Sequence, residues 1–69
     1  MKNETLLRDL EIRYELLSDR LRMARMNVMH FIAKQDYITA GYWDQMYKET
    51  WYEYKKVVNE YRKLSGEES

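Results

Sequence analysis

Apolar residues recur along the first half of the chain at alternating steps of three and four positions. Because an α-helix turns once every 3.6 residues, such a row forms one continuous stripe along a long helix. The residues of this stripe, which we call the inner row of the first helix, are Leu7, Leu10, Tyr14, Leu17, Leu21, Ala24, Val28 and Phe31. The pattern predicts a helix over residues 4–35, with Asn3 as its N-cap.

A second row with the same spacing lies on the opposite side of the same predicted helix. We call it the outer row, and it consists of Ile12, Leu16, Asp19, Met23, Met26, His30 and Ala33. One neighbouring helix covers only one side of a helix, so a helix with two opposite apolar rows lies between two neighbours. The outer row therefore predicts contact with a second copy of the chain or with another protein.

A matching row of eight positions continues in the second half of the chain. Its members are Ala40, Trp43, Tyr47, Thr50, Tyr54, Val57, Tyr61 and Leu64. Two such rows joined by a short connection predict an antiparallel helical hairpin. The predicted fold is all-α: a single coiled-coil-like hairpin domain over residues 1–69, completed as a four-helix bundle by dimerisation or by docking on a partner.

The connection is predicted at residues 36–39, where both rows of the first helix stop. Thr39 is expected to cap the second helix, with Ile38 and Trp43 forming a hydrophobic staple around the cap. The second helix is expected over residues 40–64. Ser65-Gly66 is a C-terminal stop signal, and residues 65–69 are expected to be a frayed tail.

The register of the hairpin has two solutions one heptad apart. In the favoured solution the numbers of facing residues add up to 78, which places Leu17 beside Tyr61 and Ala24 beside Tyr54, so that large side chains meet smaller ones. In the other solution the numbers add up to 71. The turn geometry decides between them and is not readable from the sequence.

The size and composition of the chain limit how it is stabilised. A chain of 69 residues buries only about 60% of the surface that its unfolded form exposes, so its core is thin. The absence of cysteine and the single histidine exclude a disulfide framework and argue against a metal site, so no cofactor is expected. Association with protein is the remaining route to stability.

The sequence predicts a cytoplasmic protein. Its longest apolar run is Phe31–Ala33, far short of the roughly 18 residues that span a bilayer. The start Met1–Thr5 is not followed by the apolar stretch of a secretory signal. Twelve basic residues balance twelve acidic ones, so the net charge gives no general attraction to nucleic acid or to anionic lipid.

Residues 20–34 have the most unusual composition in the chain, because they contain basic side chains and methionines but no acidic residue. Methionine adapts to irregular surfaces and arginine is enriched at the centres of protein interfaces. We therefore expect a partner-binding site that comprises Ile12, Leu16, Met23, Met26 and His30 with the flanking Arg20, Arg22 and Arg25. The alternative is that the methionines form the ordinary core of a four-helix dimer and that the arginines are solvated.

Two polar residues in the outer row have their own alternatives. His30 is either a half-buried residue that fixes a register or a functional side chain that meets Asp19 of an antiparallel neighbour or senses pH. Asp19 likewise is either a half-buried polar residue or the partner of such a histidine. On the second helix, Trp51 lies beside the inner row near Val58, whereas Tyr52 points away from it. Both are added to the candidate partner-binding residues because Trp and Tyr suit interfaces.

Nucleic-acid binding is an alternative function. Arg13, Arg20 and Lys34 share one edge of the first helix, and a helical-hairpin dimer with such an edge is able to grip a phosphate backbone. The chain is similar in size and hairpin architecture to the plasmid-copy-number regulators of the Rop type, although it shares no residue pattern with them. A zero net charge and acidic residues on the same helix argue against this function.

We do not expect an enzyme. Residues 16–20, Leu-Leu-Ser-Asp-Arg, with the later Lys34, resemble the first helix of the all-helical chorismate mutases, over about a quarter of the chain. That resemblance implies a substrate-binding Arg and Lys. However, those enzymes set the Lys closer to the Arg, where this chain has Phe31, and they use a third helix that the pattern here does not predict. No glycine-rich phosphate loop or Glu-x-x-His motif is present.

The sequence thus favours a small, non-enzymatic, protein-binding regulator or inhibitor. Such a protein acts by docking a helical face on a larger protein, as small phage and mobile-element proteins do when they block host machinery. A Rop-like hairpin dimer that binds RNA or DNA, or a purely structural assembly subunit, is the alternative. The expected partner is a protein or a second copy, without a membrane or small-molecule substrate.

Overall fold

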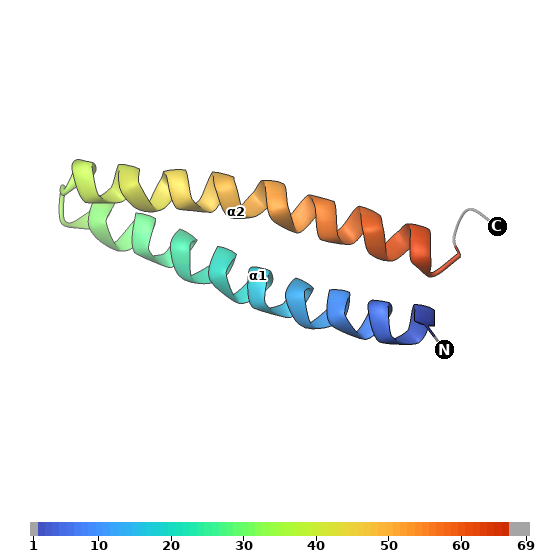
Figure 1. The fold of residues 1–69 in the computed structure, drawn as a ribbon. Helices are drawn as coiled ribbons and strands as arrows, with labels where there is room; N and C mark the ends of the chain where they lie inside the picture. Colours follow the sequence, from blue (N-terminus) through green and yellow to red (C-terminus); the bar gives the residue numbers. More distant parts are fainter. Residues whose placement is uncertain (1, 67–69) are drawn as a thin grey trace.

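The computed structural model describes residues 2–66 and shows a hairpin of two helices. Helix α1 spans Lys2–Ala33 and helix α2 spans Tyr37–Leu64, and the two pack side by side with both termini at the same end (Figure 1). The all-α hairpin predicted from the sequence is therefore confirmed.

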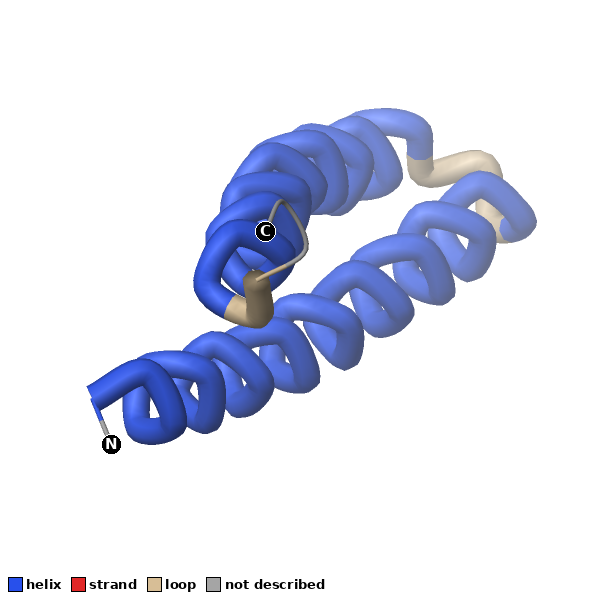
Figure 2. The backbone as a smooth tube through the Cα atoms, turned by 90° about the vertical axis from the view of Figure 1, so that its right-hand side faces the viewer, coloured by secondary structure: helices blue, strands red, loops and turns tan. Residues whose placement is uncertain are grey.

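The hairpin is a rod and not a compact bundle. Its radius of gyration is 15.6 Å, against about 11 Å for a compact chain of this length. Its extents are 51 × 18 × 12 Å, and the shortest of these is about the diameter of one helix. Figure 2 shows the same single layer from the side: within residues 2–66 no third element covers either helix.

The inner rows of both helices form the core, as predicted. The residues buried between α1 and α2 are Leu10, Leu17, Leu21, Ala24, Ala40, Thr50 and Val57, all of which belong to these rows. Tyr54, Tyr61 and Leu64 pack against the cluster of Leu10, Leu17 and Val57. The rings of tyrosine keep their hydroxyl tips at the edge of the hairpin, which lets a thin core accept such large side chains.

The favoured register was wrong, and the structure has the one that lies a heptad away. The rings of Tyr14 and Tyr54 lie 5.1 Å apart, and the Tyr61 hydroxyl donates to Glu11 at 3.0 Å. In the favoured register, Tyr14 faces Leu64, which lies ten residues or about 15 Å along the helix from Tyr54. The observed pairs instead fit a register in which facing numbers add up to about 71.

The connection explains this register, because it is shorter and earlier than predicted. Residues 34–36 separate the two helices. Gln35 adopts the left-handed conformation with φ 63°, its N–H donates to the Ile32 carbonyl at 2.9 Å, and the Asp36 N–H donates to the Phe31 carbonyl at 2.8 Å. This is a Schellman C-cap in which Gln occupies the position usually taken by Gly.

The predicted Thr39 cap and its hydrophobic staple are wrong. Asp36 caps α2, since its side chain accepts a hydrogen bond from the backbone N–H of Thr39 at 3.2 Å. Ile38 is 90% exposed and staples nothing. Asp36 closes the C-cap of α1 and is also the N-cap of α2, so the chain reverses within three residues. This tight turn sets which positions of α1 and α2 face each other.

At the open end of the hairpin, the predicted end of α2 is confirmed and the predicted start of α1 is not. Helix α1 begins at Lys2, so Asn3 lies inside its first turn and not at the predicted cap position. Helix α2 ends at Leu64, as expected, and the Ser65 N–H donates to the Tyr61 carbonyl at 2.9 Å. Gly66 has a φ of 85°, the conformation for which a C-terminal glycine is suited. Residues 67–69 of the predicted frayed tail lie outside the described residues.

Neither helix has the length and apolar character that crossing a membrane requires, over the residues that the structure describes.

Candidate functional site

The outer row of α1 is uncovered along its whole length. Each of its seven residues is exposed. The apolar ones keep much of their surface in water: Ile12 is 51% exposed, Leu16 61%, Met23 58% and Met26 64%. A single exposed Leu is ordinary on a protein surface, but a contiguous apolar strip marks a site of interaction.

Arginines flank this strip on both sides. Arg22 lies on one side, and its guanidinium contacts the Asp19 carboxylate at 3.5 Å, with about 70% of both side chains exposed (72% and 71%). The helical spacing places Arg20 on the other side of the outer row and turns Arg25 back towards α2. Arg20 and Arg22 therefore bracket the apolar strip, and the three arginines do not form one basic track.

His30 completes the strip near the end of α1. Its ring meets that of Phe31 edge-on, with centroids 5.1 Å apart, and the side chain is exposed. Phe31 belongs to the inner row and is itself half-buried, so this contact anchors the imidazole while leaving it at the surface. Both polar members of the outer row, Asp19 and His30, are thus available to a neighbour.

The structure does not bring Trp51 and Tyr52 together with the outer row. Both lie on α2, where they line a shallow depression with Tyr47, Lys48 and Lys55. Trp51 is 42% exposed and its ring stacks on Tyr54 with centroids 5.4 Å apart, so it extends the aromatic edge of the hairpin. Tyr52 is 68% exposed and points into solvent, as its spacing indicates.

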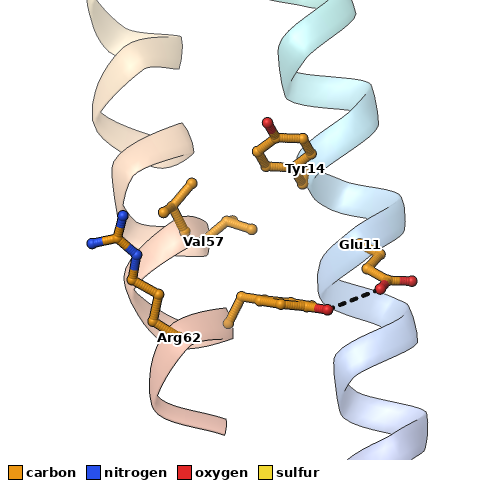
Figure 3. Close-up of a pocket in the computed structure, with 6 residues that line it drawn as sticks. Glu11, Tyr14, Val57 and Arg62 are labelled. Atoms are coloured by element: carbon orange, nitrogen blue, oxygen red, sulfur yellow. Dashed lines mark hydrogen bonds between the residues drawn. The ribbon is translucent and has the colours of Figure 1, made fainter. Parts of the chain in front are cut away.

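A groove across the open end of the hairpin was not foreseen from the sequence. It has a volume of about 340 Å³ and is lined by Glu11, Tyr14, Val57, Val58, Tyr61 and Arg62. Figure 3 shows Glu11 and Tyr14 reaching from α1, opposite Val57 and Arg62 from α2, with the hydrogen bond to Glu11 drawn as a dashed line. Its walls are mostly apolar, and Glu11 and Arg62 are its charged members.

Tyrosine hydroxyls tie the two helices together beside this groove. The Tyr61 hydroxyl donates to Glu11, and this hydrogen bond raises the pKa of Tyr61 above the ordinary value of 10.0. The Tyr54 hydroxyl donates to that of Tyr14 at 3.2 Å, and this contact likewise raises the pKa of Tyr54. Both effects favour the protonated phenol and extend its range above pH 10.

The groove was missed because it depends on the register. With Tyr61 placed beside Leu17, Glu11 has no partner on α2, whereas in the observed register the two side chains meet. The available signal was chemical: a tyrosine in a two-helix core has to direct its hydroxyl to water or to a polar neighbour at the hairpin edge.

Within residues 2–66, no cluster of three or more His, Cys, Asp or Glu side chains is placed to hold a metal ion. A scan of family models, a comparison with curated proteins and a comparison with solved structures gave no match to this chain. The geometry of the outer row is therefore the main indication of what the protein does.

Proposed function

We propose that the protein is a small, non-enzymatic regulator or inhibitor that acts by docking the outer row of α1 on a larger protein. The observation that supports this most is the continuous exposure of Leu16, Met23 and Met26 on one side of a helix whose other side is already packed. An apolar strip with a charged rim is the anatomy of a protein interface. Docking on a partner, or pairing with a second copy, completes a larger helical assembly around α1.

The mode of recognition is a helix laid in a groove of the partner. In that mode, side chains three, four and seven positions apart anchor the helix, and Leu16, Met23 and Met26 are separated by seven and three positions. Methionine side chains adjust to the shape of the groove, while Arg20 and Arg22 at the rim select partners with acidic edges. A small phage or mobile-element protein that covers a surface of host machinery is the kind of molecule that fits this description.

Affinity capture from the native host tests the proposal with three baits: the wild-type chain, Met26→Glu, and Lys56→Glu as a matched control. Lys56 is exposed on the outward side of α2, so its substitution changes charge without touching the outer row. A partner that docks on the outer row is retained by the wild-type and Lys56→Glu baits and lost by Met26→Glu. Proteins retained equally by all three baits, with none lost, contradict the proposal.

A further inference from the structure

We propose that, when no other partner is present, the outer row of α1 pairs with the outer row of a second copy in antiparallel orientation, with Asp19 of each copy opposite His30 of the other. This goes beyond the proposed function, because it identifies what covers the strip before a partner arrives. It rests on the order of side chains along the row and does not require an external partner to exist.

Six of the seven residues of the outer row are arranged symmetrically about a point between residues 24 and 25, and Ile12 has no counterpart in the row. Asp19 and His30 lie at equal distances on either side of this midpoint. Met23 and Met26 are likewise equidistant, as are Leu16 and Ala33. A two-fold axis through this midpoint therefore superimposes the row from Leu16 to Ala33 on itself, and in a two-fold dimer every contact occurs twice.

The pairs produced by this axis are complementary in charge and size. The Asp19 carboxylate accepts from a ring N–H of His30, and only one side of that carboxylate is occupied, by an exposed contact to Arg22 at 3.5 Å. The methionines meet each other, and the large Leu16 meets the small Ala33.

Other arrangements lose this complementarity. A shift of one heptad in one direction puts Asp19 against Met23, and a shift in the other puts His30 against Met26. A parallel dimer places the two Asp19 carboxylates against each other, which repels them. The two polar residues in an otherwise apolar row thus specify one register and one orientation, as single polar residues do in coiled coils.

The second copy lies on the side of α1 opposite to α2. The inner and outer rows of α1 are on opposite sides of the helix, so the four helices follow the order α2, α1, α1 of the second copy, α2 of the second copy. Seven row positions a side is a small interface beside the roughly 20–30 residues a side of a standard one. We therefore expect a reversible equilibrium between monomer and dimer and not a permanent dimer.

Sedimentation equilibrium at neutral pH tests the charge pairing. The wild-type chain should shift with concentration from 8.6 kDa to twice that mass. Asp19→Lys and His30→Glu should each weaken dimerisation at least tenfold, and the double variant should restore it because it places an ammonium group opposite a carboxylate. Lys56→Glu should leave dimerisation unchanged, and circular dichroism should show each variant to be as helical as the wild type.

A chain that stays at 8.6 kDa at all concentrations overturns the proposal. A dimer that neither single variant weakens also overturns it, and so does a double variant that does not regain dimerisation. None of these outcomes affects the capture experiment, in which Met26→Glu still reports on an external partner. The recovery in the double variant separates charge pairing across the dimer from the loss of the Asp19–Arg22 contact within one helix.

Disulfide trapping tests the orientation, and the chain suits it because it contains no cysteine. Equimolar Leu16→Cys and Ala33→Cys chains are mixed and oxidised. In the proposed dimer, the two sulfurs of a mixed pair face each other, so mixed cross-linked dimers should exceed either homodimer several-fold. An excess of Leu16→Cys homodimers, or the absence of cross-links at concentrations where sedimentation shows a dimer, overturns the antiparallel register.

Discussion

The outward sides of α1 and α2 have the same geometry and opposite composition. On α1 the outward row is apolar apart from Asp19 and His30. On α2 the outward row at the same steps begins with the exposed Ile38 and Tyr42. Its remaining residues are exposed and, apart from Tyr52, polar: Gln45, Glu49, Tyr52, Lys56, Asn59 and Lys63. The Gln45 side-chain amide donates a hydrogen bond to the Glu49 carboxylate at 3.4 Å.

Helix α2 shows what a solvated face of this hairpin looks like. A surface helix normally has polar residues opposite its packed stripe, and α2 follows this rule. Helix α1 departs from it, although both helices belong to one short rod and expose their outward sides equally. Since the thin core gives no reason for a second apolar row on α1, we infer that this row serves contact with another molecule.

The largest expected effect separates the two rows of α1. Ala24 is fully buried in the inner row, so Ala24→Glu places a charge against α2 and should cost about 3 kcal/mol or more, enough to unfold a hairpin of this size. Met26 is 64% exposed, so Met26→Glu should retain helical content and lose only association. Circular dichroism with sedimentation distinguishes the two results. Equal loss of helix in both variants would show that the rows have been misassigned.

The next largest effect is the loss of binding free energy when methionines of the outer row are replaced, compared with replacement of the arginines at its rim. If protein contacts cover the row, Met23→Ala and Met26→Ala should each weaken binding by about 2 kcal/mol, measured by calorimetry or sedimentation. Arg20→Ala should cost less, because rim charges contribute little. Lys56→Ala, on the outward side of α2, is the matched control and should cost nothing.

Nucleic-acid binding predicts the reverse order. If phosphate contacts carried the binding, each Arg→Ala change should weaken affinity for any RNA or duplex DNA and flatten the log-log salt dependence by about one unit. Micromolar affinity for generic RNA at physiological salt, lost with the arginines and unchanged with the methionines, would replace protein docking by nucleic-acid binding as the function of this face.

The sequence was sufficient for the helices and for both rows of α1, because a repeat of three and four positions translates directly into a stripe. It was not sufficient for the register. Two registers one heptad apart bury the same inner rows, and the turn chooses between them. Asp36 and Thr39 are both good N-cap residues, and only the structure shows that Asp36 accepts the hydrogen bond.

The candidate sites likewise divide into one that depends on a single helix and one that depends on the register. The outer row was readable because it depends on one helix alone, so an error in the register leaves it intact. The groove between Glu11, Tyr14 and Tyr61 depends on both helices and was lost with the register. Gln35 in a left-handed conformation gave no signal either, since glycine or asparagine is the usual residue there.

A smaller effect concerns stability without association. Gly41 is exposed within α2, and a Cβ added there meets nothing within 4 Å. Gly41→Ala should therefore stabilise the hairpin by about 0.5–1 kcal/mol, because alanine loses less backbone freedom on entering a helix. Thermal unfolding at fixed concentration measures this gain, and the dimerisation constant should not move. A change in dimerisation would indicate that the outward side of α2 also takes part in contact.

The smallest effect concerns the hydroxyl contacts between the helices at high pH. The pKa of Tyr61 is raised in the folded chain by its hydrogen bond to Glu11, above the value of 10.0 for an unperturbed tyrosine. The folded state therefore holds this proton more tightly than the unfolded state does. The resulting stabilisation is fully present below pH 10 and is lost as the pH rises through the folded pKa.

Tyr61→Phe keeps the ring and removes the hydroxyl, so the decline in unfolding free energy above pH 10 should be shallower in this variant than in the wild type. Denaturant unfolding at a series of pH values measures the two slopes. Tyr52→Phe is the matched control, because Tyr52 is 68% exposed on α2 and away from the helix pair, and it should keep the wild-type slope. Identical slopes for the wild type and Tyr61→Phe would mean that the Glu11 contact does not persist in solution. In that case the register near the open end of the hairpin would rest on the packing of Leu10, Leu17 and Val57 and on the contact between Tyr14 and Tyr54.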